Sequence, residues 1–540
     1  MSAFQGRRST HDYQPLPRAS FEVEDTFRLR RSPSNPSWLT SLARRFSRIN
    51  KFSDRAVYTH YVTPRRRKRS VLRLILWSVF SVPYILVFLV VFAAVFFPSY
   101  TVRPAHYQAL RQRALNSTIP GRANPHGEKV FISASLHEDN GHLTSGGWGR
   151  SVLELVDLLG PENVHLSIYE DNADEKTKES IINFRHKTPC NSTIVVEDLD
   201  LSTLPRITLP SGETRLKRIA FLAKVRNRAL APIDDNGVKF DRVLFLNDVN
   251  FNPIEAVQLL FATNVDSTGR ANYAAACAVD FIMPFKFYDR FATRDFDGYI
   301  TGLVFFPWFT SAGTATSRND VLSGTDAVRV RSCWSGMVAY EAAPFQDQTS
   351  TGRSAMSLAK LTEQPSSVSR VGPLQFRYNE ETFWESSECC LINADLQYRG
   401  SGFTTGFPKE PRIYMNPFVR VAYDENTLAW LSLVRRPERL YSLIHDILNY
   451  FVGFPVKQER GTEEPGQIYT NSVWEYDDPA KGLSSTASQD DLKGHWKQVT
   501  RIAEPGGFCG SPNLLVINEN PQHGEGPWSK IFVPHPPDNI

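Results

Sequence analysis

Acidic and amide side chains follow the ends of apolar segments that read as β-strands. Glu170 closes the segment VHLSIYE, and Asn247, Asp248 and Asn250 follow the apolar run VLFL. In sheets of parallel strands, ligands bind beyond the carboxyl ends of the strands, so these side chains should meet at one edge. Mg²⁺ and Mn²⁺ prefer carboxylate oxygens together with substrate phosphate. The pattern therefore predicts a site where a divalent cation bridges a diphosphate.

The structural alternative stays open for each acid taken singly, because Asp after a strand is often a helix cap or a turn residue. The sequence contains no G-x-x-x-x-G-K-[ST], no G-x-G-x-x-G after the first strand pattern and no G-x-S-x-G. These absences argue against a P-loop, a dinucleotide-binding domain and a serine hydrolase of the nucleophile-elbow type.

Strand and helix patterns alternate from residue 129 to residue 261. Strand patterns lie at 129–135, 164–169, 192–196 and 242–246, and helix patterns at 148–159, 174–184, 215–230 and 253–261. Near-continuous apolar strands alternating with helices predict an α/β fold with a mostly parallel central sheet, covered by helices on both faces.

One uncharged apolar run, Leu74–Phe97, is long enough to cross a membrane. Its 24 residues span roughly 36 Å as a helix, against a hydrocarbon core of ~30 Å. The basic cluster at 65–69 precedes it, and basic flanks stay cytosolic. We expect a single-pass type II anchor with the rest of the chain on the lumenal side. A cleaved signal peptide is the alternative, but the run is long and starts far from Met1.

These patterns divide the chain into five parts. They are a disordered basic cytosolic tail (1–70), a transmembrane signal-anchor helix (71–97), a lumenal stem (98–128), a catalytic domain (129–430) and a C-terminal helical and irregular extension (431–540). We expect helices at 105–115 in the stem and at 428–451, and a flexible Ser/Thr/Gln-rich insertion at 346–372.

The charge distribution and the cysteine positions indicate which partners and which cell compartment to expect. The chain of 540 residues has a net charge of +4, but residues 1–70 hold 16 Lys/Arg and 5 Asp/Glu, so the remainder is net acidic. Beside a membrane span, a basic tail sets topology and meets lipid headgroups, so we expect no nucleic-acid partner.

All six cysteines lie beyond the span, and none forms a zinc-type pair. An oxidising compartment would allow disulfides, whose connectivity the sequence does not reveal. The sequons at Asn116 and Asn191 favour the same compartment.

Several segments, in chain order, resemble the cryptococcal capsule mannosyltransferase family, glycosyltransferase family 69 of fungi. The resemblance is carried by the strand LFLNDV (244–249) and by the helix FLAKVRNRAL (221–230) before it. Further matching blocks are FISASLHEDN (131–140), LGPENVHLSIYED (159–171), AAACAVDF (274–281), TRDFDG (293–298), SCWSGMVAYEAAPF (332–345), SSECCL (386–391) and YMNPFVRVAYD (414–424). The blocks cover roughly 129–430.

The resemblance implies a GT-A-type nucleotide-sugar-binding fold, a GDP-mannose donor and a Mn²⁺ (or Mg²⁺) cofactor. It also implies transfer of mannose to a mannoside or polysaccharide acceptor, in α-1,3 linkage and with retention of configuration. The type II topology derived from the sequence fits a Golgi membrane enzyme with a lumenal catalytic domain.

Site residues follow from the same resemblance. Asp248 is the expected ligand of the metal or the donor ribose, and Asn250 a weaker metal ligand. On the basic helix we expect Arg226 and Asn227 to face the nucleotide, where a cation would counter the diphosphate. Glu170 is expected to contact the ribose or base.

The acceptor side is expected to involve later acids. Asp295 and Asp297 form a literal D-x-D in a loop, which we expect near donor or acceptor. Glu388 is expected to bind the acceptor or to stabilise the transition state, and to act as general base only if the enzyme inverts.

Two other functions remain open. The motif at 247–250 reads N-D-V-N instead of D-x-D, which leaves room for a non-catalytic, membrane-anchored carbohydrate-binding or scaffold protein. The same fold could also use a different nucleotide-sugar donor.

Overall fold

The computed structural model describes residues 71–209, 213–235, 237–346, 372–401, 410–456, 458–476, 494–519 and 526–533. The predicted tail at 1–70 and nearly all of the predicted insertion at 346–372 lie outside these residues. The chain from Val90 to Ile540 belongs to one compact unit, and the part of the first described helix before Val90 belongs to another.

Helix α2 (Val71–Phe96) contains the predicted membrane span. Within the described residues it is the one helix long and apolar enough to cross a membrane, over Ile75–Phe96. The predicted stem helix is α3 (Ala105–Asn116), whose buried residues Tyr107 and Leu110 face the domain. Because α3 packs against helix α8 (Pro253–Ala262), this part of the stem is docked on the folded domain.

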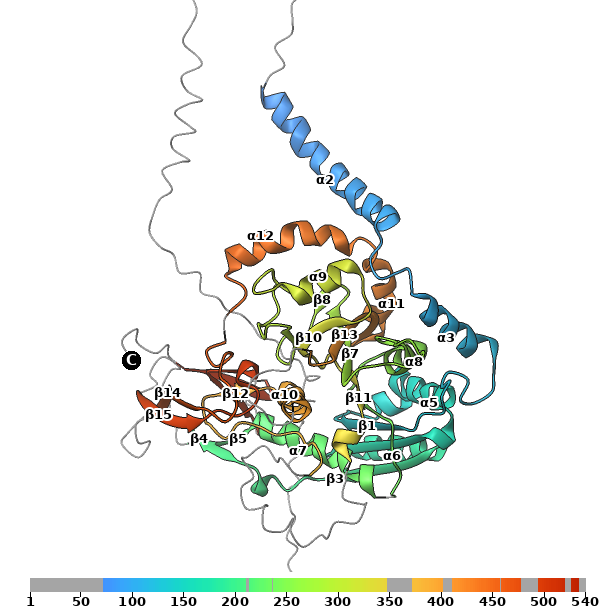
Figure 1. Cartoon of the computed structure of the whole chain (residues 1–540), viewed down its shortest axis with the longest axis vertical. Helices are drawn as coiled ribbons and strands as arrows, with labels where there is room; N and C mark the ends of the chain where they lie inside the picture. Colours follow the sequence, from blue (N-terminus) through green and yellow to red (C-terminus); the bar gives the residue numbers. More distant parts are fainter. Residues whose placement is uncertain are drawn as a thin grey trace, which may run out of the picture. The chain divides into compact units, whose positions relative to one another are not determined.

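A ten-stranded mixed sheet forms the centre of the domain (Figure 1), in the order β3-β2-β1-β6-β11-β7-β13-β10-β9, with β8 paired to β7. Its strands are β1 (Val130–Leu136), β2 (Val164–Asp171), β3 (Asn191–Glu197), β6 (Arg242–Leu246), β7 (Ala275–Met283), β8 (Lys286–Phe287), β9 (Arg294–Asp295), β10 (Val328–Ser332), β11 (Met337–Glu341) and β13 (Ile413–Ala422).

Most of the long strands run in one direction. Strands β3, β2, β1 and β6 are mutually parallel, and β7 is parallel to β13. Strand β11 is antiparallel to both β6 and β7, so it joins two blocks of strands that point the same way. The predicted α/β class with a mostly parallel central sheet is confirmed.

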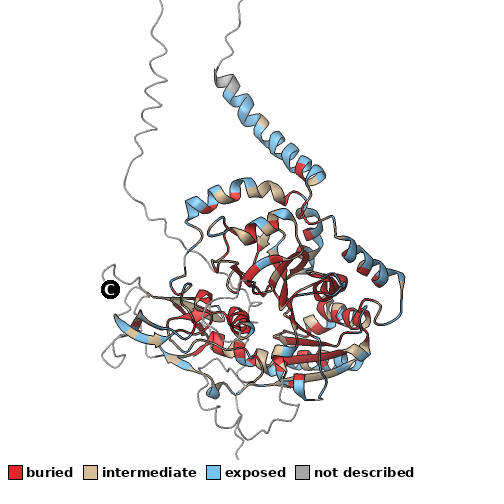
Figure 2. Ribbon diagram, viewed as in Figure 1, coloured by how far each residue is buried: buried red, intermediate tan, exposed pale blue. Residues whose placement is uncertain are grey.

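Helices cover the sheet in two layers. Helices α7 (Arg218–Leu230) and α10 (Glu388–Gly400) contact each other, and α7 lies on β1 and β2. Helices α5 (Gly147–Leu159) and α8 form a second contacting pair, with the short α4 (His142–Ser145) and then α6 (Glu175–Lys187) beside α5. Strands β1 and β2 are buried along almost their whole length (Figure 2), as expected for strands covered on both faces.

The C-terminal part contains strands where the sequence suggested an irregular extension. A hairpin forms from β14 (Ile468–Tyr476) and β15 (Gly494–Ile502). A second sheet, in the order β18-β17-β5-β4, joins β17 (Asn513–Ile517) and β18 (Trp528–Phe532) to β5 (Thr214–Lys217) and β4 (Arg206–Thr208), which precede α7. Strand β17 also contacts α7.

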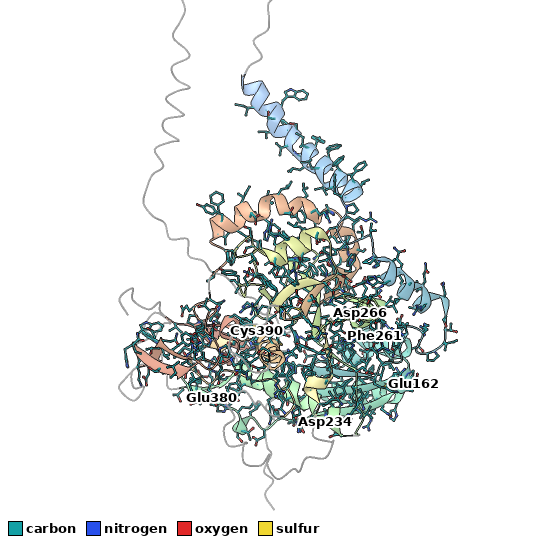
Figure 3. All side chains as sticks on the ribbon, viewed as in Figure 1. Glu162, Asp234, Phe261, Asp266, Glu380 and Cys390 are labelled. Atoms are coloured by element: carbon teal, nitrogen blue, oxygen red, sulfur yellow. A yellow bond between two sulfur atoms is a disulfide. The ribbon has the colours of Figure 1, made fainter. Side chains whose placement is uncertain are left out.

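Two disulfides hold this arrangement. Cys277 is bonded to Cys333 across β7 and the end of β10. Cys390 of α10, labelled in Figure 3, is bonded to Cys509, 119 residues later in the chain. Cys190 and Cys389 are free thiols.

Two predicted helices differ from the structure. The helix predicted at 215–230 begins only at Arg218, because residues 214–217 pair as strand β5 with β17, a tertiary contact that the local pattern does not reveal. The helix predicted at 428–451 is divided into α11 (Glu425–Val434) and α12 (Ser442–Val452). Pro437 lies between them, and proline cannot supply the N–H that a continuous helix needs.

Candidate active site

A cavity of about 930 Å³ opens where β1, β2 and β6 end. Its walls also include the first turn of α5, one face of α7, and residues 517–519 and 527–528 at the adjoining ends of β17 and β18. This is the carboxyl edge of the parallel strands, where the sequence predicted the ligand site.

Arg226 of α7 reaches the cavity and is held from three sides. Its Nε donates to Glu388 Oε1 at 3.0 Å, its Nη1 donates to Asn247 Oδ1 at 3.2 Å, and its guanidinium lies 4.6 Å from the centre of the Trp334 ring. Burial alone would lower the pKa of Arg226, but Cys389 and Glu388 beside it raise that pKa overall. The side chain is therefore a fixed cation at the cavity wall.

Asn247 connects the end of β6 to its surroundings. Its backbone carbonyl accepts a hydrogen bond from Trp148 Nε1 at 2.9 Å, and its N–H donates to the carbonyl of Gly336 at 2.9 Å. Gly336 has φ +69°, and a Cβ there would lie 2.7 Å from Val249 Cγ1. This close approach fixes the turn that presents Asp248.

Asp248 and Asn250 both line the cavity and are half-buried. The backbone of Asn250 is held in both directions by Ala422, with N···O distances of 2.7 and 3.0 Å. No group of three or more His, Cys, Asp or Glu side chains placed to hold a metal ion occurs in the described part of the chain. Asp248 and Asn250 thus suit a cation held by one carboxylate together with substrate phosphate, as is common for Mg²⁺. They do not suit a site in which the protein supplies every ligand.

Arg218 provides a second cation on the same face of α7. It is buried, it lines the cavity, and its guanidinium lies 4.9 Å from the centre of the Trp528 ring. Burial lowers the pKa of Arg218 to about 10, so it stays protonated at neutral pH. Arg218 and Arg226 together give the cavity wall two positive charges, suited to an anionic ligand such as a diphosphate.

Two acids and a tyrosine form a hydrogen-bonded group near Asp248, whose charge acts on that tyrosine, Tyr423. Burial raises the pKa of Asp280 to about 8, and the carboxylate of Asp289 beside it adds to that rise. Asp280 accepts hydrogen bonds from Tyr423 Oη at 3.2 Å and from the Asp289 N–H at 3.0 Å. Asp280 is fully buried and does not line the cavity.

Of the predicted nucleotide and metal residues, the structure brings Arg226, Asp248 and Asn250 together on the cavity wall. Glu388, 1% exposed, lies behind Arg226 and not on the wall. Asn227 faces another way, because its side chain exchanges two hydrogen bonds of 2.8 Å with the backbone of Phe376.

Glu170 lies beneath the cavity. It is fully buried, and its Oε1 accepts a hydrogen bond from the Glu138 N–H at 3.0 Å. Burial raises its pKa to about 9, so the group is neutral at pH 7. Its neighbour Asp171 lines the cavity instead, and its carboxylate accepts the Leu199 N–H at 2.8 Å.

The D-x-D pair lies at the far edge of the sheet from β3. Asp295 belongs to β9 and accepts the N–H groups of Asp297 and Tyr299, at 3.0 and 2.8 Å. Asp297 accepts the N–H and hydroxyl of Thr314, both at 2.7 Å. Both carboxylates are thus used in turns, and neither lines the cavity.

Sequence reasoning missed the residues that the C-terminal segment contributes. Asn518, Glu519 and Trp528 line the cavity, and Arg218 opposite them was not among the predicted cations. No local signal in the sequence identifies them, because β17 reaches the site by pairing with β5, about 300 residues earlier.

Comparisons with known proteins agree with the resemblance seen in the sequence. Residues 129–395 match the model of the family described as Cryptococcal mannosyltransferase 1. No curated protein sequence matches the chain.

Two solved structures share a distant likeness. Mannosyltransferase PcManGT from Pyrobaculum calidifontis, in complex with GDP-Man and Mn²⁺, has 10% identity and a TM-score of 0.29, covering 64% of this chain and 70% of its own. Mannosyl-3-phosphoglycerate synthase from Rubrobacter xylanophilus has 13% identity and a TM-score of 0.26, covering 75% of this chain and 98% of its own.

Proposed function

We propose that this chain is a glycosyltransferase that moves mannose from GDP-mannose to a mannoside acceptor, because residues 129–395 match the cryptococcal mannosyltransferase family model. The observation that supports this most directly is the cavity at the strand ends, where Asp248 and two arginines, Arg218 and Arg226, lie on one wall. An acid and two cations on one wall suit a nucleoside diphosphate bound with a divalent cation.

The donor would be held by its diphosphate. Arg218 and Arg226 counter the phosphate charge, and the first turn of α5 lines the same cavity with Gly147 and Trp148. Helix N-termini favour anions because their first N–H groups have no partner within the helix. The nucleoside would then extend toward the ends of β1 and β2, near Asp171.

Asp248 and Asn250 would hold Mn²⁺ or Mg²⁺ together with the diphosphate. When bound, the ion neutralises charge that develops on the leaving group. The chain's own contribution is a rigid frame, in which the hydrogen bonds of Asn247 fix the direction of Asp248.

We further propose α-1,3 transfer with retention of configuration, as the family resemblance implies. In that case the acceptor hydroxyl would lose its proton to the departing phosphate oxygen, and no protein general base is needed. Glu388 then acts as a positioning residue, through its ion pair with Arg226. Asp295 and Asp297, with their carboxylates used in turns, are the weaker candidates for contact with substrate.

The proposed topology is single-pass type II in the Golgi membrane, with the domain in the lumen. Helix α2 supports the anchor by its length and composition, and the two disulfides suit an oxidising compartment. In intact microsomes, protease should trim the tail before α2 and spare the chain beyond it. Digestion of the domain without detergent would contradict the type II assignment.

The competing function is a non-catalytic carbohydrate-binding or scaffold protein. GDP binding separates the two proposals. A mannosyltransferase should bind GDP more tightly with Mn²⁺ than without it, and more tightly than UDP. A scaffold that lost the donor site should show neither difference.

A further inference from the structure

Helix α12 (Ser442–Val452) has its polarity reversed relative to an ordinary surface helix. Its apolar residues face outward: Leu443, Ile444, Ile447, Leu448, Tyr450, Phe451 and Val452 are all exposed, from 39% for Leu448 to 82% for Tyr450. Its polar residues His445 and Asn449 are instead buried against the domain. At 100° per residue, the seven apolar side chains fill one continuous arc, and the helix carries no Lys, Arg or Glu.

The inward side of α12 is bound by specific polar contacts. Asn449 Oδ1 accepts the Leu303 N–H at 2.9 Å, and Arg318 lies 3.1 Å from His445 Nδ1 and 3.0 Å from Asp446. Burial lowers the pKa of His445 to about 4, so it is neutral and stays buried at physiological pH. The helix therefore cannot turn its apolar arc inward without breaking these contacts.

The chain leaves the membrane span close to this helix. Two residues after the end of the apolar run, the Ser99 N–H donates to the carbonyl of Arg436 at 3.4 Å, and Tyr100 packs on Phe418 with ring centres 4.9 Å apart. The Tyr100 hydroxyl also donates to the carbonyl of Val321 at 2.9 Å. Ser99 and Tyr100 are both buried, so the segment that joins the span to the domain is packed against the domain.

Geometry then limits how far α12 can be from the bilayer. A span that ends at Phe97 puts the membrane surface within about 7 Å of Ser99, since two residues extend no further. Arg436, which binds Ser99, is only six residues before α12 begins. An outward apolar arc at this position matches helices that lie in the membrane interface, with Tyr at the headgroup level.

We propose that α12 lies in the lumenal face of the membrane that α2 spans, so that the domain is held by two contacts and not by one span alone. This inference rests on the membrane anchor of the proposed function. The occupant of the apolar arc is the lipid bilayer. The short junction to the span and the lack of charge on the arc favour lipid over a protein partner.

The test uses the full chain in nanodiscs, with Cys190→Ser as background, because Cys389 is buried. A single environment-sensitive nitrobenzoxadiazole probe is attached at Ile447→Cys. Matched probes are attached at Val87→Cys, inside α2, and at Lys187→Cys, an exposed position at the end of α6. Emission is compared in ordinary lipid and in lipid brominated near the headgroup end of the acyl chain for Ile447→Cys and Lys187→Cys, and near the terminal end of the acyl chain for Val87→Cys, which lies at the middle of the span.

The proposal predicts a blue-shifted emission at Ile447→Cys and about twofold quenching by brominated lipid, because interfacial helices bury their apolar face 5–10 Å into the boundary. Lys187→Cys should show neither effect. If the probe at Val87→Cys is quenched but the probe at Ile447→Cys emits as it does in water, the inference about α12 is overturned. The membrane anchor formed by α2 would then still be supported. A blue shift at Ile447→Cys without quenching would mean that protein covers the arc, which also overturns it. If Val87→Cys is not quenched, the anchor fails and the inference fails with it.

Discussion

Arg226 and Glu388, 162 residues apart in the chain, form an ion pair of 3.0 Å beside the cavity, with Glu388 almost fully buried. The carboxylate touches the arginine and not the cavity, so its effect on a ligand must pass through Arg226. An acceptor-binding role, expected from the sequence, would require direct access that the buried carboxylate does not have.

Glu388→Gln should therefore weaken donor binding. The amide can still accept from Arg226 Nε, but the buried guanidinium loses its counter-charge and its fixed direction. We expect the KM for GDP-mannose to rise by about tenfold, because a hydrogen bond to a neutral amide is weaker than one to a carboxylate, with a smaller change in the KM for acceptor. Glu388→Asp, which keeps the charge, should recover part of the loss. A change confined to the acceptor KM would place Glu388 at the acceptor instead.

Asp248→Asn should lower turnover by about 10²-fold or more, because the metal-binding carboxylate contributes several kcal/mol of charge stabilisation. Mn²⁺ should also no longer tighten GDP binding to this variant, as measured by calorimetry. Asp266→Asn is the matched control, since Asp266 (Figure 3) lies in an exposed turn after α8. Wild-type turnover in Asp248→Asn would show that Asp248 does not hold the metal.

Trp528→Ala tests the part of the site that the C-terminal segment contributes. Trp528 lies over Arg218, and a cation–π contact of this kind contributes about 0.5–1 kcal/mol, so the donor KM should rise by about two- to fivefold. Trp528→Phe keeps an aromatic ring and should restore most of the affinity. Equal kinetics for the alanine and phenylalanine variants would argue against this contact.

The contrast between Asp248 and Trp528 shows what the sequence can and cannot reveal. Asp248 follows an apolar strand directly, so the alternating pattern alone placed it at the ligand-binding edge of a parallel sheet. Trp528 reaches the same cavity only because β17 pairs with β5, and such long-range pairing leaves no periodic signal. Glu170 also ends a strand, but its side chain is fully buried, and burial raises its pKa, which the local pattern does not reveal.

Removing the disulfide between Cys390 and Cys509 should destabilise the domain. The bond closes a loop of 119 residues, for which chain entropy predicts about 2–5 kcal/mol of stabilisation. The double variant Cys390→Ser, Cys509→Ser should unfold at lower denaturant concentration than wild type, and its C-terminal strands should be cleaved first in limited proteolysis. Cys190→Ser, which removes a free thiol, should leave the midpoint unchanged.

The buried Glu170 should make stability depend on pH. Its pKa is about 9 in the folded chain and 4.5 as a free side chain, so the folded state holds a proton that the unfolded state releases between these values. Its contribution is fully present below pH 4.5 and is lost as pH rises toward 9.

Glu170→Gln cannot titrate, so the fall in Tm from pH 5 to pH 8.5 should be shallower in this variant than in wild type. Asp280 also has a raised pKa and should leave a residual slope. Glu162→Gln, at an exposed position labelled in Figure 3, should keep the full wild-type slope. Parallel curves for wild type and Glu170→Gln would show that Glu170 is not the titrating group.

The central claim is mannosyl transfer at the cavity on the β1, β2 and β6 ends, and its most direct test is product formation by the full chain. Purified protein in nanodiscs is given Mn²⁺, an α-mannoside acceptor and radiolabelled GDP-mannose, with Asp248→Asn assayed beside wild type. The account predicts a mannosylated product from wild type, an α-1,3 linkage by NMR, and loss of about 10²-fold or more of this activity in Asp248→Asn. The account would be contradicted if no mannose were transferred from GDP-mannose, whether or not another nucleotide sugar served as donor.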